Sequence, residues 1–437
     1  MKICCLLGIV AVLSTPLHAQ NAFADDIREL TGIVKRRWAY LEHRQKISGL
    51  DLVQLEKDAL RTVGTSEDPA VFARALRRYV SRLEDGHGWV TVSGEVRKPR
   101  RLPFTLADAA EGVIVHGVGI GTPKKDLRPG DVLLLIDGKP VEAALKEAAH
   151  EVCASTAGAR RAGALFRLCS FTDRKSISVE VQRADGSKSR ATLACPPTGT
   201  AIPTPMIPVW KRKETVIEKG IGYFRPGSFR PPADSGWSTA RPEQRDEILK
   251  DSYTALRKTM ERLRESRVLI LDIRGNGGGT DLLGKELAGM LLPKKSVYYR
   301  LQARDADGSW RASFPSPVRS SPGFGPFGGA LICLIDEGTF STADNFAACL
   351  RDNHSDITFV GRPTGAGTGA PRPFTLTRTK VRVTFCTMRV FSPKGTMIEG
   401  TGVKPDVPVR WTRRDVLGPE DADLAKALEL ARRKIAR

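Results

Sequence analysis

Ser341 lies where an apolar strand is followed by an amphipathic helix, a place where a serine can act as a nucleophile. Residues 331–335 are all apolar, and apolar side chains at 343, 346, 347 and 350 share one face of the following helix. Free amides and the positive end of the helix dipole there favour an anion such as the oxyanion of acyl transfer. Because serine is also a preferred N-cap, helix capping remains the alternative for this segment.

A second segment, residues 272–279, has the sequence Asp-Ile-Arg-Gly-Asn-Gly-Gly-Gly and also follows an apolar strand. Glycine backbone can approach a reacting carbonyl closely and direct its amides toward it. Neither a Lys-Ser/Thr pair nor a complete dinucleotide fingerprint follows, so the segment does not indicate phosphate binding. The glycine-rich run at 365–369 is interpreted as a flexible loop.

A nucleophilic serine needs a base, and five histidines follow residue 19. Four of them are expected at the surface, beside a strand or too far along the helix after Ser341: His43, His116, His150 and His354. His87, between Gly86 and Gly88, is therefore the candidate base by elimination. A structural role for this histidine is the alternative.

The pattern of apolar residues changes twice along the chain. Residues 22–85 have helical spacing, and residues 103–197 contain short strands and a helix. After a proline-rich linker, apolar strands alternate with amphipathic helices, which predicts an α/β core with a mixed sheet. The expected domains are a signal peptide (1–19), a helical N-terminal region carrying His87 (20–97), a β-rich domain (98–197) and the α/β core (198–437).

The first 19 residues predict export. Lys2 precedes 11 apolar residues, and small residues precede a cleavage site after Ala19. Eleven apolar residues are too few to span a bilayer, so no integral membrane segment is expected. The protein is expected to be periplasmic or secreted.

The chain of 437 residues has a net charge of +20, which becomes +19 when Lys2 is removed with the leader. Such a charge favours attraction to anionic surfaces. Basic residues occur in runs of three at most, without interleaved aromatic residues, so nucleic acid is not an expected partner. The absence of a Cys-x-x-Cys motif argues against a zinc ribbon, and Cys153 with Cys169 is a candidate disulfide in an oxidising compartment.

Residues 127–141 resemble the second half of a bacterial PDZ domain, most specifically at Pro-Gly-Asp (129–131) and Ile-Asp-Gly (136–138). The resemblance implies a site for peptide tails in this domain. Its carboxylate-binding loop is placed, on weaker grounds, at Val118, Gly119 and Ile120. A PDZ-shaped spacer that binds nothing is the alternative.

Taken together, the motifs resemble, in order, those of the C-terminal processing (tail-specific) and tricorn-core family of serine proteases. They are Asp-Gly-His (85–87), the PDZ-like domain, Ile-Gly-Tyr-Phe (221–224), Asp-x-Arg-x-Asn-x-Gly-Gly (272–279), Asp-Glu-Gly-Thr-x-Ser (336–341), Gly-Arg-Pro-Thr (361–364) and Glu-Gly-x-Gly-Val-x-Pro-Asp (399–406). The resemblance implies that Ser341 is the nucleophile and that the amides of Gly278 and Thr342 form the oxyanion hole.

The base distinguishes two branches of this family. Tail-specific members use a lysine after the nucleophile, but Gly367 occupies the matching position here. Tricorn-like members use an N-terminal histidine supported by a C-terminal glutamate, which His87 and Glu399 match. The tricorn core has a serine before its histidine, whereas this chain has Gly86, so His87 and Glu399 are expected to meet directly or through another hydroxyl.

The sequence therefore predicts an exported serine endopeptidase that acts on protein or peptide substrates and binds their C-termini through the PDZ-like domain. No metal or cofactor is expected. The alternative is a catalytically inactive protein that binds peptides or apolar ligands on the same scaffold. Retention of both Ser341 and His87 favours the enzyme.

Overall fold

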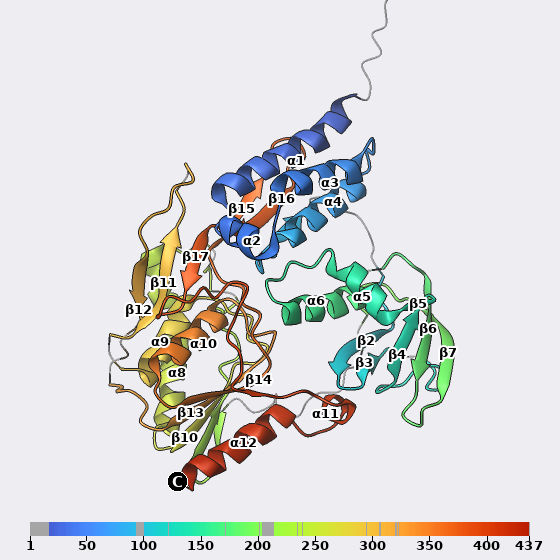
Figure 1. Ribbon diagram of the computed structural model, residues 1–437. Helices are drawn as coiled ribbons and strands as arrows, with labels where there is room; N and C mark the ends of the chain where they lie inside the picture. The colour runs from blue at the N-terminus through green and yellow to red at the C-terminus, as the bar shows by residue number, and fades with distance from the viewer. Residues whose placement is uncertain are drawn as a thin grey trace, which may run out of the picture.

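The computed structural model describes residues 17–436 except 93–99, 121, 171, 201, 203–213, 234, 238, 294, 306, 320 and 322 (Figure 1). In Figure 1 the core lies at the left, a helical body lies above it, and a β-rich domain lies at the right. No helix within the described ranges is long and apolar enough to cross a membrane. The apolar run of the expected signal peptide lies outside these ranges.

The upper body combines helices from the start of the chain with strands from near its end. Its helices are α1 (Leu17–Arg37), α2 (Leu41–Ser48), α3 (Leu52–Val63) and α4 (Pro69–Arg82). Their apolar faces pack on the sheet of β1 (Trp89–Thr91), β16 (Arg382–Cys386) and β15 (Pro371–Thr375). Residues of the expected helical N-terminal region (20–97) and of the expected α/β core (198–437) therefore share one hydrophobic core.

The β-rich domain has a sheet in the order β2-β3-β4-β6-β7, with β5 paired to β4. Its elements are β2 (Phe104–Ala109), β3 (Gly112–Val118), β4 (Val132–Ile136), β5 (Lys139–Pro140), α5 (Val141–Ala149), α6 (Ala157–Ser170), β6 (Ser176–Gln182) and β7 (Lys188–Ala194). Helix α6 was not expected, because Gly158 and Gly163 weaken its helical pattern. Cys153 and Cys169 are free thiols, so the disulfide considered from the sequence is not formed.

The core sheet has the order β18-β14-β13-β10-β9-β8, with all pairs parallel except that of β8 with β9. Its strands are β8 (Glu214–Glu218), β9 (Ile221–Phe224), β10 (Val268–Asp272), β13 (Ala330–Ile335), β14 (Ile357–Gly361) and β18 (Val407–Pro408). A smaller antiparallel sheet contains β12 (Phe314–Pro317), β11 (Val297–Ala303) and β17 (Met388–Phe391).

Helices cover both faces of the core sheet. Helices α8 (Lys250–Leu263), α9 (Asp281–Leu291) and α10 (Thr342–Asn353) lie on one face, and α12 (Ala422–Ile435) lies on the other. The short helix α7 (Arg245–Ile248) precedes α8, and α11 (Arg413–Leu417) packs on β2 and β3 of the β-rich domain. Leu269 and Leu271 of β10 pack with residues of α8, α9 and α10, whereas Val268 and Ile270 pack with α12. This arrangement explains the wholly apolar strands and confirms the expected mixed-sheet α/β core.

Candidate active site

Two turns come together at the carboxyl ends of adjacent parallel strands. Asp272, the last residue of β10, is level with Leu334 of β13. The glycine-rich turn after β10 and the Ser341 turn after β13 therefore leave the same edge of the sheet, where α/β proteins commonly place their sites.

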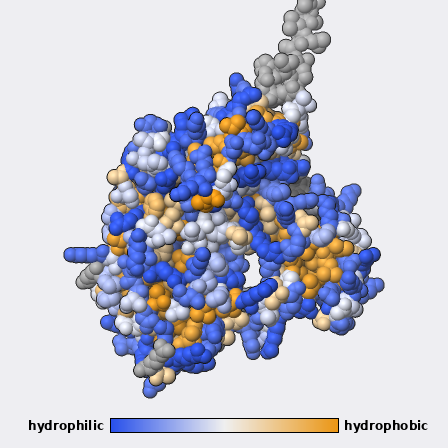
Figure 2. Space-filling model, in the orientation of Figure 1, coloured by the Kyte–Doolittle hydropathy of each residue, from blue (hydrophilic) through white to orange (hydrophobic). Residues whose placement is uncertain are grey.

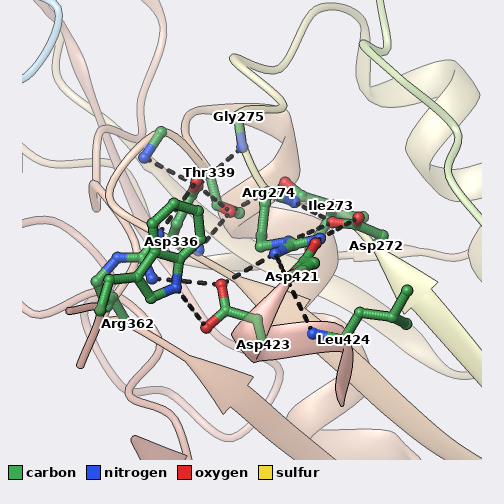
Figure 3. A network of polar contacts seen from close by, with 12 residues as sticks. Asp272, Ile273, Arg274, Gly275, Asp336, Thr339, Arg362, Asp421, Asp423 and Leu424 are labelled. Atoms are coloured by element: carbon green, nitrogen blue, oxygen red, sulfur yellow. Dashed lines mark hydrogen bonds and ion pairs between the residues drawn. The ribbon is translucent and has the colours of Figure 1, made fainter. Parts of the chain in front are cut away.

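A buried ion network holds the first turn in place (Figure 3). Arg274 forms ion pairs with Asp272 at 2.7 Å, Asp421 at 2.6 Å and Asp423 at 3.0 Å, and all four side chains are at most 1% exposed. Asp421 also accepts a hydrogen bond from the Leu424 amide and so caps α12. The network ties the glycine-rich turn to the last helix of the chain.

Ser341 does not cap α10 with its side chain. Its backbone has φ 61° and ψ −123°, and its hydroxyl makes no capping hydrogen bond. A positive φ is strained for any residue other than glycine, at a cost of about 1–3 kcal/mol. The N-cap alternative considered from the sequence therefore does not account for this side chain.

The hydroxyl of Ser341 instead faces His87. The distance between Ser341 Oγ and His87 Nε2 is 3.2 Å, which is within hydrogen-bond reach. The His87 ring also packs on Phe340, with ring centroids 4.7 Å apart. The structure thus brings Ser341 and His87 together, as expected from the sequence.

Burial lowers the pKa of His87 below its ordinary value of 6.5, and the nearby Asp85 carboxylate acts in the opposite direction. A lower pKa keeps the imidazole neutral at neutral pH. A neutral Nε2 can accept a proton, so the ring is in a state suited to a general base.

Glu399 is fully buried and contacts backbone amides near His87. Its Oε1 accepts a hydrogen bond from Gly86 N at 3.2 Å, and its Oε2 accepts one from Thr368 N at 2.8 Å. Burial raises the pKa of Glu399 well above its usual range, and Asp85 adds to this rise. Glu399 therefore joins the loop before His87 to the loop that contains Thr368.

The far nitrogen of His87 faces a residue that the sequence analysis missed. Cys386 Sγ lies 3.5 Å from His87 Nδ1, and it is also 3.2 Å from the carbonyl oxygen of Thr368. Cys386 is fully buried at the end of β16. No local motif marks it, because it reaches His87 through the pairing of β16 with β1.

Asp85, His87 and Cys386 present ligand atoms that all lie within 4.8 Å of one another, a set able to hold a metal ion. The Asp85 carboxylate, however, already accepts three N–H groups: His87 N at 2.8 Å, Trp38 Nε1 at 2.9 Å and Cys386 N at 2.8 Å. These contacts satisfy the buried carboxylate with hydrogen bonds alone.

Gly278 and Thr342, expected to form an oxyanion hole, lie next to Ser341. A Cβ at Gly278 would lie 2.7 Å from Ser341 Cβ and 2.8 Å from Thr342 N, so only glycine fits there. Thr342 is the first residue of α10, where amides lack a partner within the helix. The Gly278 amide donates to Asn276 Oδ1 at 3.0 Å.

Gly367, at the position of the tail-specific lysine, packs directly on Phe340. A Cβ there would lie 1.8 Å from Phe340 Cε2, so no side chain fits while this ring packs against His87. Lys394, the lysine nearest to the Glu399 motif in sequence, is exposed, and its amide donates to Asp352. The geometry therefore gives a physical reason for the missing lysine.

The expected carboxylate-binding loop of the β-rich domain lies at the end of β3. Ile120 is 89% exposed, and the Gly119 amide already donates to Pro103 O at 2.7 Å. A cavity of about 960 Å³ lies elsewhere, between β2 and α6 on one side and Arg362 and Trp411 of the core on the other. Figure 2 shows an opening between the β-rich domain and the core, with apolar residues beside it.

Comparisons with known proteins identify the class. Residues 220–409 match the family model described as Peptidase family S41. The chain therefore carries a peptidase family S41 domain, and the serine-type peptidase family expected from the motifs is confirmed.

One curated relative is similar over most of the chain. "Carboxyl-terminal-processing peptidase 2, chloroplastic" of Arabidopsis thaliana is 26% identical over 367 residues, which cover 80% of this chain and 59% of that protein. The chain thus spans less than two thirds of that relative's length.

Two solved structures share the fold. Mature CPAF complexed with lactacystin matches with a TM-score of 0.75 and 16% identity, covering 96% of this chain and 99% of CPAF. A putative peptidase from Parabacteroides merdae ATCC 43184 matches with a TM-score of 0.53 and 15% identity, over 94% of this chain and 96% of that one.

Proposed function

We propose that this protein is a serine endopeptidase that cleaves peptide bonds through an acyl-enzyme on Ser341, with His87 as the base. The observation that carries the proposal is the 3.2 Å contact between Ser341 Oγ and His87 Nε2. The strained Ser341 backbone and the absence of a capping hydrogen bond leave the hydroxyl available for this contact.

In the first half of the reaction, Ser341 Oγ attacks the scissile carbonyl carbon as its proton passes to His87 Nε2. The amides of Thr342 and Gly278 donate hydrogen bonds to the oxyanion that forms. The Gly278 amide exchanges Asn276 Oδ1 for this oxyanion. When the intermediate collapses, the C–N bond breaks and the amine leaves with the proton from His87.

In the second half, water attacks the ester carbonyl of the acyl-enzyme and gives a proton to His87 Nε2. The Ser341 ester bond breaks, the carboxylic acid product leaves, and the proton returns to Ser341 Oγ. Both half-reactions use the same base and the same oxyanion donors, as in other serine peptidases.

The β-rich domain is proposed to act as a PDZ-like module that presents substrate tails. Strand β2 is an edge strand of its sheet and lines the cavity that faces the core. An extended peptide can add to such an edge through main-chain hydrogen bonds. Because the Gly119 amide is already used, the β2 side of the cavity is a better place for the tail than residues 118–120.

Export to the periplasm or the cell exterior is proposed from the leader alone. The charged start, the 11 apolar residues and the small residues before Ala19 support it. N-terminal sequencing of the protein purified from the cells that produce it tests the proposal. A mature chain beginning at Gln20 is expected, and retention of Met1 and Lys2 in the mature protein would contradict it.

Turnover of an unfolded protein substrate tests the activity. Ser341→Ala and His87→Ala are expected to lose at least about a thousandfold in kcat, because removal of a nucleophile or its base abolishes acyl transfer. Lys394→Ala is the matched control and should retain activity. Full activity of Ser341→Ala, or loss in Lys394→Ala alone, would contradict the proposal.

The same experiment separates the enzyme from a binding protein on this scaffold. The largely apolar cavity beside β2 is the observation that favours the binding alternative. If the wild type shows no turnover but binds peptides as tightly as Ser341→Ala does, the binding alternative is correct.

A further inference from the structure

We infer that Cys386 positions His87 through Nδ1 and that Asp85, not Glu399, supplies the negative charge behind the ring. The inference rests on the proposed peptidase function. It assigns three different tasks to three buried residues around one histidine.

The state of the His87 ring requires an acceptor at Nδ1. For Nε2 to take a proton from Ser341, the neutral ring must carry its own proton on Nδ1. Cys386 Sγ, 3.5 Å away, faces this nitrogen. The thiol can donate its own hydrogen to Thr368 O at 3.2 Å, which leaves sulfur lone pairs toward Nδ1–H.

The thiol is held in the state that this role requires. Burial raises the pKa of Cys386 well above its usual range, so the group stays protonated and can donate to Thr368 O. Pairing of β16 with β1 fixes the backbone of Cys386 beside His87. Nδ1 of His87 therefore faces a weak acceptor, Cys386 Sγ, whose position is fixed by the strand pairing.

Asp85 is placed to supply the charge. It accepts hydrogen bonds from the backbone amides on both sides of the contact, His87 N and Cys386 N, and from Trp38 Nε1. These three N–H donors satisfy both oxygens of the buried carboxylate and fix its position behind the ring. One of its oxygens lies within 4.8 Å of a His87 ring nitrogen, close enough for its charge to stabilise the imidazolium.

Glu399 makes a different set of contacts. Both of its oxygens accept backbone amides, those of Gly86 and Thr368. Its burial favours the uncharged form. Glu399 thus sets the spacing of the two loops that flank His87 and Cys386.

Substitution at Cys386 tests the positioning role. In Cys386→Ala, kcat should fall about tenfold with KM unchanged, the effect of losing one hydrogen bond. Cys386→Ser, which keeps an acceptor and a donor, should recover most of this loss. Cys333→Ala, at another fully buried cysteine in β13, is the matched control and should keep full activity.

A spectroscopic readout separates positioning from general damage. In ¹⁵N-histidine-labelled protein, the His87 signals, identified by their loss in His87→Ala, should show Nδ1–H in the wild type and in Cys386→Ser. In Cys386→Ala the signals should show a mixture of both tautomers. Unchanged kcat and unchanged ring signals in Cys386→Ala would overturn the positioning role.

The acidic limb of kcat/KM against pH tests the source of charge. Asp85→Asn should move the limb to lower pH, because loss of a nearby negative charge lowers the pKa of His87. Glu399→Gln should leave its position unchanged even if the rate or stability falls. If the acidic limb moves in Glu399→Gln, the assignment of the negative charge to Asp85 is wrong. The Glu399→Gln measurement gives this answer even if Asp85→Asn does not fold.

Failure of the inference is distinguishable from failure of the proposed function. If Ser341→Ala abolishes turnover but the Cys386 and Asp85 variants behave like the wild type, only the inference fails. If the wild type has no turnover, the proposed function fails, and the ring signals still report whether Cys386 sets the tautomer.

Discussion

Val90 of β1 lies directly opposite Val383 of β16, and this strand pairing positions His87 next to the end of β16. Gly88 alone separates His87 from β1, and Cys386 is the last residue of β16. The short three-stranded sheet therefore connects the N-terminal helices with the site around Ser341. Activity should depend on the packing of this sheet as well as on the residues of the site.

Val90→Asp tests this dependence. Val90 is 8% exposed within the core of the upper body, so a charge there should lower the free energy of unfolding by about 2–4 kcal/mol and reduce kcat/KM at least about tenfold. Val53→Asp is the control, because Val53 is 63% exposed and its replacement should change little. Chemical denaturation and peptide turnover measure the two effects; equal behaviour of both variants would refute the role of the sheet.

Gly367→Ala should impair the reaction without unfolding the protein. The added Cβ would lie within 2.0 Å of two ring carbons of Phe340, so this ring must move away from His87 and disturb the Ser341 turn. We expect kcat to fall at least about tenfold. Gly328→Ala, where a Cβ meets nothing within 4 Å, should retain activity. Wild-type kcat in Gly367→Ala would show that Phe340 need not hold its place.

The pH profile should reflect the shifted pKa of His87. Because burial lowers this pKa below 6.5, the neutral base persists at lower pH than for an exposed histidine, and the acidic limb of kcat/KM should be centred below pH 6.5. Steady-state kinetics from pH 4 to 9 provide the test, with His354→Gln as a control that leaves the limb in place. A limb centred at or above 6.5 would contradict the burial of the ring.

Arg274→Met should be strongly destabilising. It leaves Asp272, Asp421 and Asp423 buried without their common cation, which typically costs about 3–5 kcal/mol. The exposed ion pair of Arg433 with Glu429 provides the control, since Arg433→Met should cost less than about 1 kcal/mol. Denaturant unfolding measures both, and similar losses for the two variants would mean that the network contributes little.

That Ser341 and His87 meet could be predicted because the signals that mark each residue are local. Ser341 follows an apolar strand and begins a helix, and His87 has glycine on both sides. The order of the motifs resembles that of a serine protease family, and this resemblance predicts that Gly278, Thr342 and Glu399 belong to the same site. The structure places all of them around one point, with Glu399 bound to amides beside His87 rather than to its ring.

The rest depends on contacts between distant segments. Cys386 is an ordinary strand residue in sequence, and only the pairing of β16 with β1 makes it face Nδ1 of His87. The contact of Phe340 with Gly367 likewise arises from two separate loops. Helix α6 was not predicted because its two glycines interrupt the apolar pattern of the face that packs in the β-rich domain.

Covalent labelling by a fluorophosphonate probe, mapped by mass spectrometry, decides whether His87 activates Ser341. We expect a single adduct at Ser341 in the wild type, no adduct in Ser341→Ala, and much slower labelling in His87→Ala because Nε2 no longer takes the proton. Ser187→Ala, in the exposed turn between β6 and β7, should label like the wild type. An adduct at another serine, or equal labelling rates in the wild type and His87→Ala, would show that Ser341 is not a nucleophile activated by His87.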